Sequence, residues 1–173
     1  ALLDTRDESR AYAQAAEYGP AFSESYRRVT SPKDAVRDVE RLERLRCAES
    51  RLELDLLREP GRAARLKVYV PERPYLTDLL PTIDEFGLCV VDATTTELAT
   101  SRGTFWIISF RIDALECDGP SQERVLEGLG RALRGQVESS PLHRLILGAG
   151  LDWREVDLLR ARAVMATKKL YLH

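Results

Sequence analysis

The sequence has few of the residues that most often build catalytic and metal sites. It has two histidines, His143 and His173, and neither stands near a cysteine or in a patterned serine arrangement. The three cysteines, Cys47, Cys89 and Cys117, lie far apart and lack the spacing of metal ligands. A catalytic triad and a metal site therefore have no support, and we expect free thiols in a reducing cytoplasm.

The sequence also lacks a large excess of positive or negative charge, and it lacks long hydrophobic runs. Lys and Arg total 26 against 28 Asp and Glu, so the basic surface that nucleic acid requires is not expected. No apolar run approaches the roughly 18 residues of a membrane span. The N-terminal segment lacks the apolar core of a signal peptide, because it carries Asp4, Arg6, Asp7, Glu8 and Arg10. The first residue is not methionine, which agrees with an internal segment. We expect a cytoplasmic protein with neither a membrane nor a nucleic-acid partner.

Glycines that could hold a dinucleotide phosphate are in the wrong setting. Gly128 and Gly130 lie inside a helical pattern, while Gly148 and Gly150 follow a helix instead of a strand. Neither pair completes G-x-G-x-x-G in the strand–turn–helix context that the motif needs. The sequence predicts no catalytic, cofactor-binding or metal-binding residue.

Helices are predicted toward both ends. A charged, alanine-rich run predicts a helix over 4–18, and Ser31 with Pro32 opens a second one. Phe22 and Tyr26 fall in the connector between the two. We expect the charged side chains of the second helix to form a solvated face.

A helical hairpin is predicted near the C-terminus. Ser140 is expected to cap a helix that starts at Pro141, and Gly148 and Gly150 offer a left-handed ending. Asp152 and Glu155 have the spacing of a capping box for the next helix. Its apolar face is expected to consist of Val156, Leu159, Ala163 and Leu170.

Between these ends the hydrophobic period changes from 3.6 to 2, which indicates strands. Pro60–Gly61 marks a hairpin turn, Thr77 is expected to cap a helix, and Gly87 to close it. The expected order is strand, strand, helix, strand, strand, helix, over 51–58, 65–70, 78–86, from 88 to 96, 105–112 and from 120.

This order predicts an α+β, ferredoxin-like fold. From 65 to 135 it follows a βαββα path that lacks the usual last strand, and 51–58 would take that strand's place beside the first. We expect a four-stranded antiparallel sheet with helices on one face, flanked by N- and C-terminal helices. The predicted segments are an N-terminal helical segment over 1–48, an ACT-like domain over 49–137 and a helical hairpin over 138–173.

Two strings resemble a known family. Residues 139–163 read SSPLHRLILGAGLDWREVDLLRARA, with Arg144–Leu145, Gly150–Leu151, Trp153–Arg154–Glu155–Val156 and Leu159–Arg160–Ala161. They resemble the segment before the catalytic region of the large NAD-dependent glutamate dehydrogenases of bacteria. FSESYRRVTSPKDAVRDVERLERL resembles the region before the last regulatory domain of the same enzymes.

A third string, VYVPERPYLTDLLPTIDEFGLCVVDA at 68–93, resembles an ACT domain, a small regulatory module. Its match consists of a strand, Arg73–Pro74, a helix, and Gly87–Leu88 leading into the second strand. The resemblance implies an amino-acid effector in the turn after the first strand, often across a dimer interface. The implied effector-binding residues are Arg73, Pro74, Tyr75, Leu76, Thr77 and Asp78.

The resemblance implies a non-catalytic regulatory or interdomain segment. The parent enzyme would oxidatively deaminate L-glutamate to 2-oxoglutarate and ammonia with NAD as cofactor, and this fragment would hold neither the cofactor nor the active-site lysine of the family. The implied partners are the catalytic region of the same chain, further copies in a homo-oligomer, and an amino-acid effector. The alternative is an independent amino-acid-binding ACT-type sensor or dimerisation module.

Overall fold

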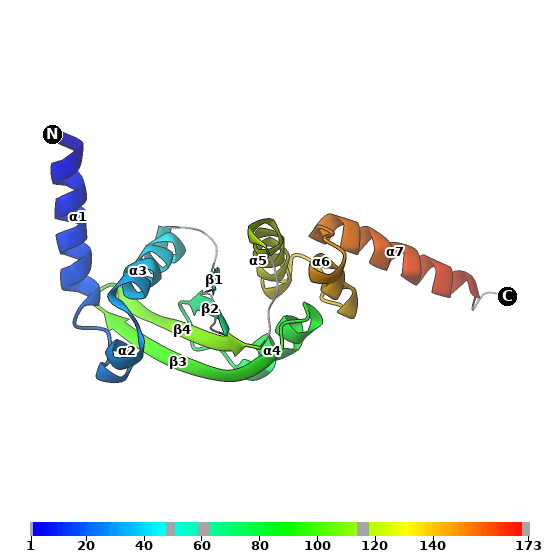
Figure 1. The fold of residues 1–173 in the computed structure, drawn as a ribbon, viewed down its shortest axis with the longest axis horizontal. Helices are drawn as coiled ribbons and strands as arrows, with labels where there is room; N and C mark the ends of the chain where they lie inside the picture. The colour runs from blue at the N-terminus through cyan, green and yellow to red at the C-terminus, as the bar shows by residue number, and fades with distance from the viewer. Residues whose placement is uncertain (1, 48–50, 59–62, 114–117, 171–173) are drawn as a thin grey trace. The chain divides into compact units, whose positions relative to one another are not determined.

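The computed structural model describes residues 2–47, 51–58, 63–113 and 118–170. Cys117 and His173 lie outside the described residues, as does the predicted turn at Pro60–Gly61. Figure 1 shows the elements, whose bounds are α1 Leu2–Tyr18, α2 Glu24–Val29, α3 Pro32–Cys47, β1 Glu53–Leu57, β2 Ala64–Val70, α4 Leu76–Glu85, β3 Val90–Thr100, β4 Gly103–Ile112, α5 Gly119–Leu133, the 3-10 helix η1 Pro141–His143, α6 Arg144–Gly148 and α7 Trp153–Leu170.

The four strands form one antiparallel sheet in the order β1-β2-β4-β3. The predicted α+β fold, a four-stranded antiparallel sheet with helices, is therefore confirmed. The pairing of β1 with β2 is also confirmed, so the first strand of the chain takes the edge position beside β2. Most residues of the two central strands are buried, whereas in edge strand β3 only Leu98 is.

The described chain separates into two compact units. The first unit comprises Ala1–Asp55, Lys67–Pro74 and Ala93–Ser109, and the second comprises Leu56–Leu66, Tyr75–Asp92 and Phe110–His173. Each unit is described below by itself. The three-segment domain division drawn from the sequence stays a prediction.

The N-terminal helices of the first unit differ from the prediction in one element. The connector between α1 and α3 contains a short helix, α2, which begins after Ser23. The Ser23 hydroxyl accepts a hydrogen bond from the Tyr26 backbone N–H at 3.2 Å. The α3 start is as predicted, with Ser31 Oγ accepting from the Asp34 N–H at 3.2 Å. The expectation of a plain connector was wrong because a single capped turn carries too few residues to show a helical period.

The hydrophobic core of the first unit joins these helices to the strands. The rings of Phe22 and Tyr26 stack with centroids 4.3 Å apart. The buried cluster consists of Tyr18, Phe22, Tyr26, Leu42, Leu45, Tyr69, Leu98, Phe105 and Ile107. Apolar burial from α1, α2, α3 and three strands is thus shared in one core, which is the main favourable term in folding this unit.

Helix α4 begins earlier than predicted. The N-cap position is Tyr75, whose side chain makes no capping hydrogen bond within the described chain. Thr77, the predicted cap, lies inside the helix, and its hydroxyl donates to Asp78 Oδ1 at 3.4 Å. The prediction for Gly87 holds. Its φ of 76° is left-handed, and its N–H donates to the Asp84 carbonyl at 2.8 Å.

The predicted C-terminal hairpin is three helical pieces in the structure. Pro141 starts the short 3-10 helix η1, and α6 follows it. Ser140 is at the N-cap, but the cap contact is its backbone N–H donating to His143 Nδ1 at 3.2 Å. The Ser140 hydroxyl has no hydrogen-bond partner among the described residues. Gly150 is left-handed as predicted, with φ 69°. Gly148 is not left-handed, because it is still the last helical residue of α6.

The capping box of α7 is confirmed. Asp152 Oδ1 accepts from the Glu155 N–H at 2.9 Å, and Glu155 Oε2 accepts from the Asp152 N–H at 2.8 Å. Of the predicted apolar face, Val156 is fully buried, whereas Leu159 and Ala163 are exposed. The side chain of Leu170 lies outside the part of the chain that is described.

Candidate functional site

The predicted effector residues lie in the segment that leads into α4. In the first unit, the Arg73 guanidinium lies over the Trp106 ring, 5.6 Å from its centroid, which is a cation–π distance. In the second unit, Tyr75 is 72% exposed. Leu76, Thr77 and Asp78 are exposed as well, and Pro74 is half-buried. Binding of an amino acid at these residues stays a prediction.

A buried cluster of polar side chains lies in the first unit, centred on Asp38 of α3. The Asp38 carboxylate is fully buried and accepts from Lys67 Nζ at 2.7 Å on each oxygen. Tyr69 Oη donates to Asp38 Oδ1 at 2.7 Å, and Tyr26 Oη donates to Oδ2. One carboxylate therefore joins α3 to both α2 and β2.

The expectation that the charged side chains of α3 form a solvated face is wrong for Asp38 and Glu43. Glu43 is 8% exposed and accepts from Tyr18 Oη at 2.8 Å. The signal that could have found Asp38 was its phase, since it precedes the buried Leu42 and Leu45 by four and seven residues. These positions share one face of a helix. Lys67 of β2 is also buried, at 5% exposed, although lysine is seldom buried unless it is paired.

The protonation of the buried tyrosines follows from their surroundings. Burial, and next the Asp38 charge, raises the pKa of Tyr26 and of Tyr69 far above the ordinary 10.0. Burial and the hydrogen bond to Glu43 raise the pKa of Tyr18 in the same direction. The phenols therefore stay protonated and act as hydrogen-bond donors to the two carboxylates.

A further ionic group ties α3 to β1 within the first unit. Asp55 is 2% exposed and accepts from Arg41 Nη2 at 3.0 Å and from Arg37 Nη2 at 3.2 Å. Arg41 also lies 3.7 Å from Glu53. These contacts position a helix on a strand.

In the second unit, the packing centres on Gly128 of α5. A Cβ at this position would lie 3.0 Å from the Phe86 ring and 3.1 Å from Ile146 Cδ1. His143 is 1% exposed and stacks on Phe86 with ring centroids 4.5 Å apart. Gly128 is therefore a position where α5 packs closely against its neighbours.

The two glycine pairs considered for a dinucleotide phosphate do not follow strands in the structure. Gly128 and Gly130 lie within α5, and Gly148 ends α6, so neither glycine pair follows a strand as phosphate binding requires. In the described ranges, no group of three or more His, Cys, Asp and Glu side chains could hold a metal ion. Within the same ranges, no helix is both long and apolar enough to cross a membrane.

Two family models match the chain, and they agree on one family. Residues 1–45 match the helical motif 2 of glutamate dehydrogenase, and residues 51–123 match its ACT3 domain. The chain belongs to the glutamate dehydrogenase family. The resemblance predicted from the sequence is thereby confirmed. Two of the strings that carry it lie within the matched residues, and the string at 139–163 follows them.

Three curated relatives of this glutamate dehydrogenase segment carry the name NAD-specific glutamate dehydrogenase. The Halomonas elongata protein is 34% identical over 83% of this chain and 9% of its own length. The Mycobacterium tuberculosis protein is 28% identical over 87% of this chain and 10% of its own. The Pseudomonas aeruginosa protein is 27% identical over 94% of this chain and 10% of its own length. The segment therefore spans about a tenth of the length of these relatives.

Proposed function

We propose that this chain is a non-catalytic regulatory and interdomain segment of an NAD-dependent glutamate dehydrogenase. The parent enzyme would oxidatively deaminate L-glutamate to 2-oxoglutarate and ammonia, with NAD as the hydride acceptor. The name of the relatives supports the parent reaction, and the ACT3 match supports a regulatory role. We propose that the chemistry belongs to the rest of the parent chain, of which this segment spans about a tenth.

The physical role that we propose is docking, and α7 carries it. Leu158, Leu159, Val164 and Met165 are 57%, 42%, 45% and 63% exposed. Ala161, Ala163 and Ala166 add further exposed apolar surface on the same helix. Apolar side chains gathered along one helix in this way are typical of a surface that another part of a protein covers. We propose that the catalytic region of the same parent chain is what covers it.

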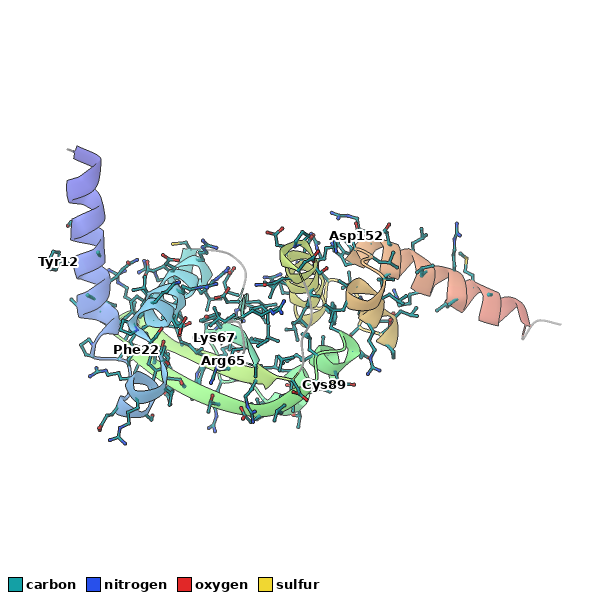
Figure 2. All side chains as sticks on the ribbon, in the orientation of Figure 1. Tyr12, Phe22, Arg65, Lys67, Cys89 and Asp152 are labelled. Carbon is teal, nitrogen blue, oxygen red and sulfur yellow. The ribbon has the colours of Figure 1, made fainter. Side chains whose placement is uncertain are left out.

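The start of α7 is fixed, which gives the exposed part a defined direction within the second unit. Val156 is fully buried, and α7 contacts η1, α5 and α6. Asp152, labelled in Figure 2 where α7 begins, caps the helix. Helix α7 is held at its start and carries exposed apolar side chains beyond it. It can therefore bind another region of the parent chain without any change in the fold of the second unit.

The test uses one substitution in two settings. Because Leu159 is exposed in this chain, Leu159→Asp should leave the melting temperature of chain 1–173 unchanged within about 1 °C. In the full-length parent enzyme, the same substitution should bury a charge in the docked interface. It should lower the melting temperature and reduce the glutamate-dependent rate by at least tenfold, a factor that corresponds to about 1.4 kcal/mol.

The matched control is Val29→Asp, at another apolar residue that is 77% exposed but lies on α2. It should leave both proteins as they are. If Leu159→Asp and Val29→Asp both leave the parent enzyme unchanged, α7 is not a docking surface and the proposed role is wrong.

A further inference from the structure

We infer that Asp38 is a buried lock that makes α2, α3 and the β2 residues 67–70 one rigid body. As one body, the helices of residues 1–45 and the strand residues of the first unit open, close and move together. The matched family models treat residues 1–45 and residues 51–123 as separate parts of glutamate dehydrogenase. The contacts of Asp38 cross that division.

The geometry of the lock leaves little freedom. Lys67 Nζ lies 2.7 Å from both Asp38 oxygens, so the ammonium is centred on the carboxylate. Each oxygen accepts one more hydrogen bond, from Tyr69 on Oδ1 and from Tyr26 on Oδ2. The side chain of Lys67, labelled in Figure 2, is 7% exposed and that of Asp38 is fully buried.

The polar character of these contacts makes the lock selective for one arrangement. Apolar side chains can slide past one another by a fraction of a turn and still remain buried. A buried carboxylate and ammonium cannot separate without leaving two unpaired charges in a medium of low dielectric constant. Any movement of α3 along β2 therefore breaks the three contacts of Asp38 with Lys67 and Tyr69 together, and intermediate positions are unfavourable.

Two further ties extend the rigid body from α3 to its neighbours. Tyr18, the last residue of α1, donates to Glu43 at 2.8 Å. Asp55 of β1 binds Arg41 at 3.0 Å. Helix α3 thus contacts α1, α2, β1 and β2 through buried or half-buried charged groups. A displacement at any one of these elements is passed to the others through α3.

Hydrogen–deuterium exchange of chain 1–173 tests the inference directly. In the wild type, the slowest amides of α3 and those of residues 67–70 and 103–109 should report the same opening free energy. Asp38→Asn leaves the Lys67 ammonium without its counter-charge. It should therefore raise the exchange rates of all three segments by the same factor, on the order of 100-fold.

A matched control uses an exposed ion pair of the same unit. Glu24 and Arg28 lie 2.6 Å apart with side chains 80% and 74% exposed. Glu24→Gln should leave all three segments unchanged, because solvated ion pairs contribute little. If Asp38→Asn accelerates exchange in α3 alone and leaves residues 67–70 and 103–109 at the wild-type rate, the two parts open separately and the inference is overturned.

A gentler variant covers the case in which Asp38→Asn does not fold. Tyr69→Phe keeps the ring and removes one hydrogen bond to the carboxylate. It should speed exchange in α3 and in both strand segments together by about tenfold, the loss expected for one hydrogen bond to a charged group. Acceleration confined to either side of the contact would overturn the inference in the same way.

Discussion

The indole N–H of Trp153 donates a hydrogen bond to Glu127 Oε1 at 2.9 Å. This contact joins the first residue of α7 to α5. The same ring lies between two guanidinium groups, with Arg131 4.3 Å and Arg154 4.6 Å from the ring centroid. Trp153 therefore fixes the direction of the exposed helix that we propose to dock on the catalytic region.

Removing the Trp153 ring should loosen α7. Because the ring is half-buried and makes two cation–π contacts, Trp153→Ala should lower the free energy of unfolding by about 2 kcal/mol. Trp153→Phe keeps one aromatic ring for stacking but loses the N–H and the second ring of the indole, so its cost should be smaller, about 1 kcal/mol. Urea denaturation followed by circular dichroism measures both. Equal, negligible losses for the two variants would mean that the ring does not hold α7.

The space around Gly128 of α5 and around Gly148 of α6 predicts opposite effects of an added methyl group on stability. A methyl group at Gly128 meets Phe86 and Ile146, which are both fully buried and cannot yield easily. The strain, about 1–3 kcal/mol, should exceed the gain of up to about 1 kcal/mol from replacing a helical glycine. Gly128→Ala should thus lower the melting temperature.

Gly148→Ala is the matched control. Among the described residues, nothing lies within 4 Å of a Cβ added there. It should leave the free energy of unfolding unchanged or raise it by up to about 1 kcal/mol. A higher melting temperature for Gly128→Ala than for Gly148→Ala would contradict the packing described for α5.

The buried tyrosines predict a loss of stability at alkaline pH. Burial raises the folded-state pKa of Tyr18, Tyr26 and Tyr69 above the unfolded value of about 10. A raised folded-state pKa contributes stability that is fully present below pH about 10. That contribution is lost as the pH rises from there toward the folded-state pKa, because the unfolded chain releases protons first.

Urea titrations between pH about 8 and 11.5 measure this dependence. Tyr69→Phe should lower stability at neutral pH and make the alkaline decline shallower. Tyr12→Phe, at a side chain that is 79% exposed, should change neither. A decline of the same slope in the Tyr69→Phe variant would show that Tyr69 does not contribute to it.

The predicted effector turn has its own test, independent of the docking proposal. If an amino acid binds at residues 73–78, saturating ligand should raise the melting temperature by mass action. Arg73→Ala or Asp78→Ala should abolish the shift, whereas Arg65→Ala, at an exposed residue of β2, should preserve it. A titration of the twenty common amino acids that leaves the melting temperature unchanged would remove the effector from the account.

The sheet could be predicted from the sequence because its signal is local and repeated. Leu52, Leu54 and Leu56 alternate with charged residues, and this alternation was enough to place β1 beside β2. The short helix α2 was missed because a single turn shows no period. The start of α4 was misplaced because Thr77 has a capping side chain, yet the chain enters the helix at Leu76.

The Asp38 cluster was missed for a different physical reason. Asp38 lies in a run of charged residues, and such runs are usually solvated. Its burial depends on Lys67 and Tyr69, which are 29 and 31 residues away in sequence and meet it only after the sheet has formed. Composition and hydrophobic periodicity describe one helix or strand at a time. They cannot predict which side chains of a second element will contact a given residue.

The central claim is that this segment of a glutamate dehydrogenase performs no reaction and holds no NAD. The most direct measurement adds NAD and L-glutamate to purified chain 1–173 and to the full-length parent at equal molar concentration, and follows NADH absorbance. The account predicts NADH formation by the parent alone. A separate calorimetric titration of chain 1–173 with NAD should show no heat of binding. Glutamate-dependent NADH formation by chain 1–173 would contradict it.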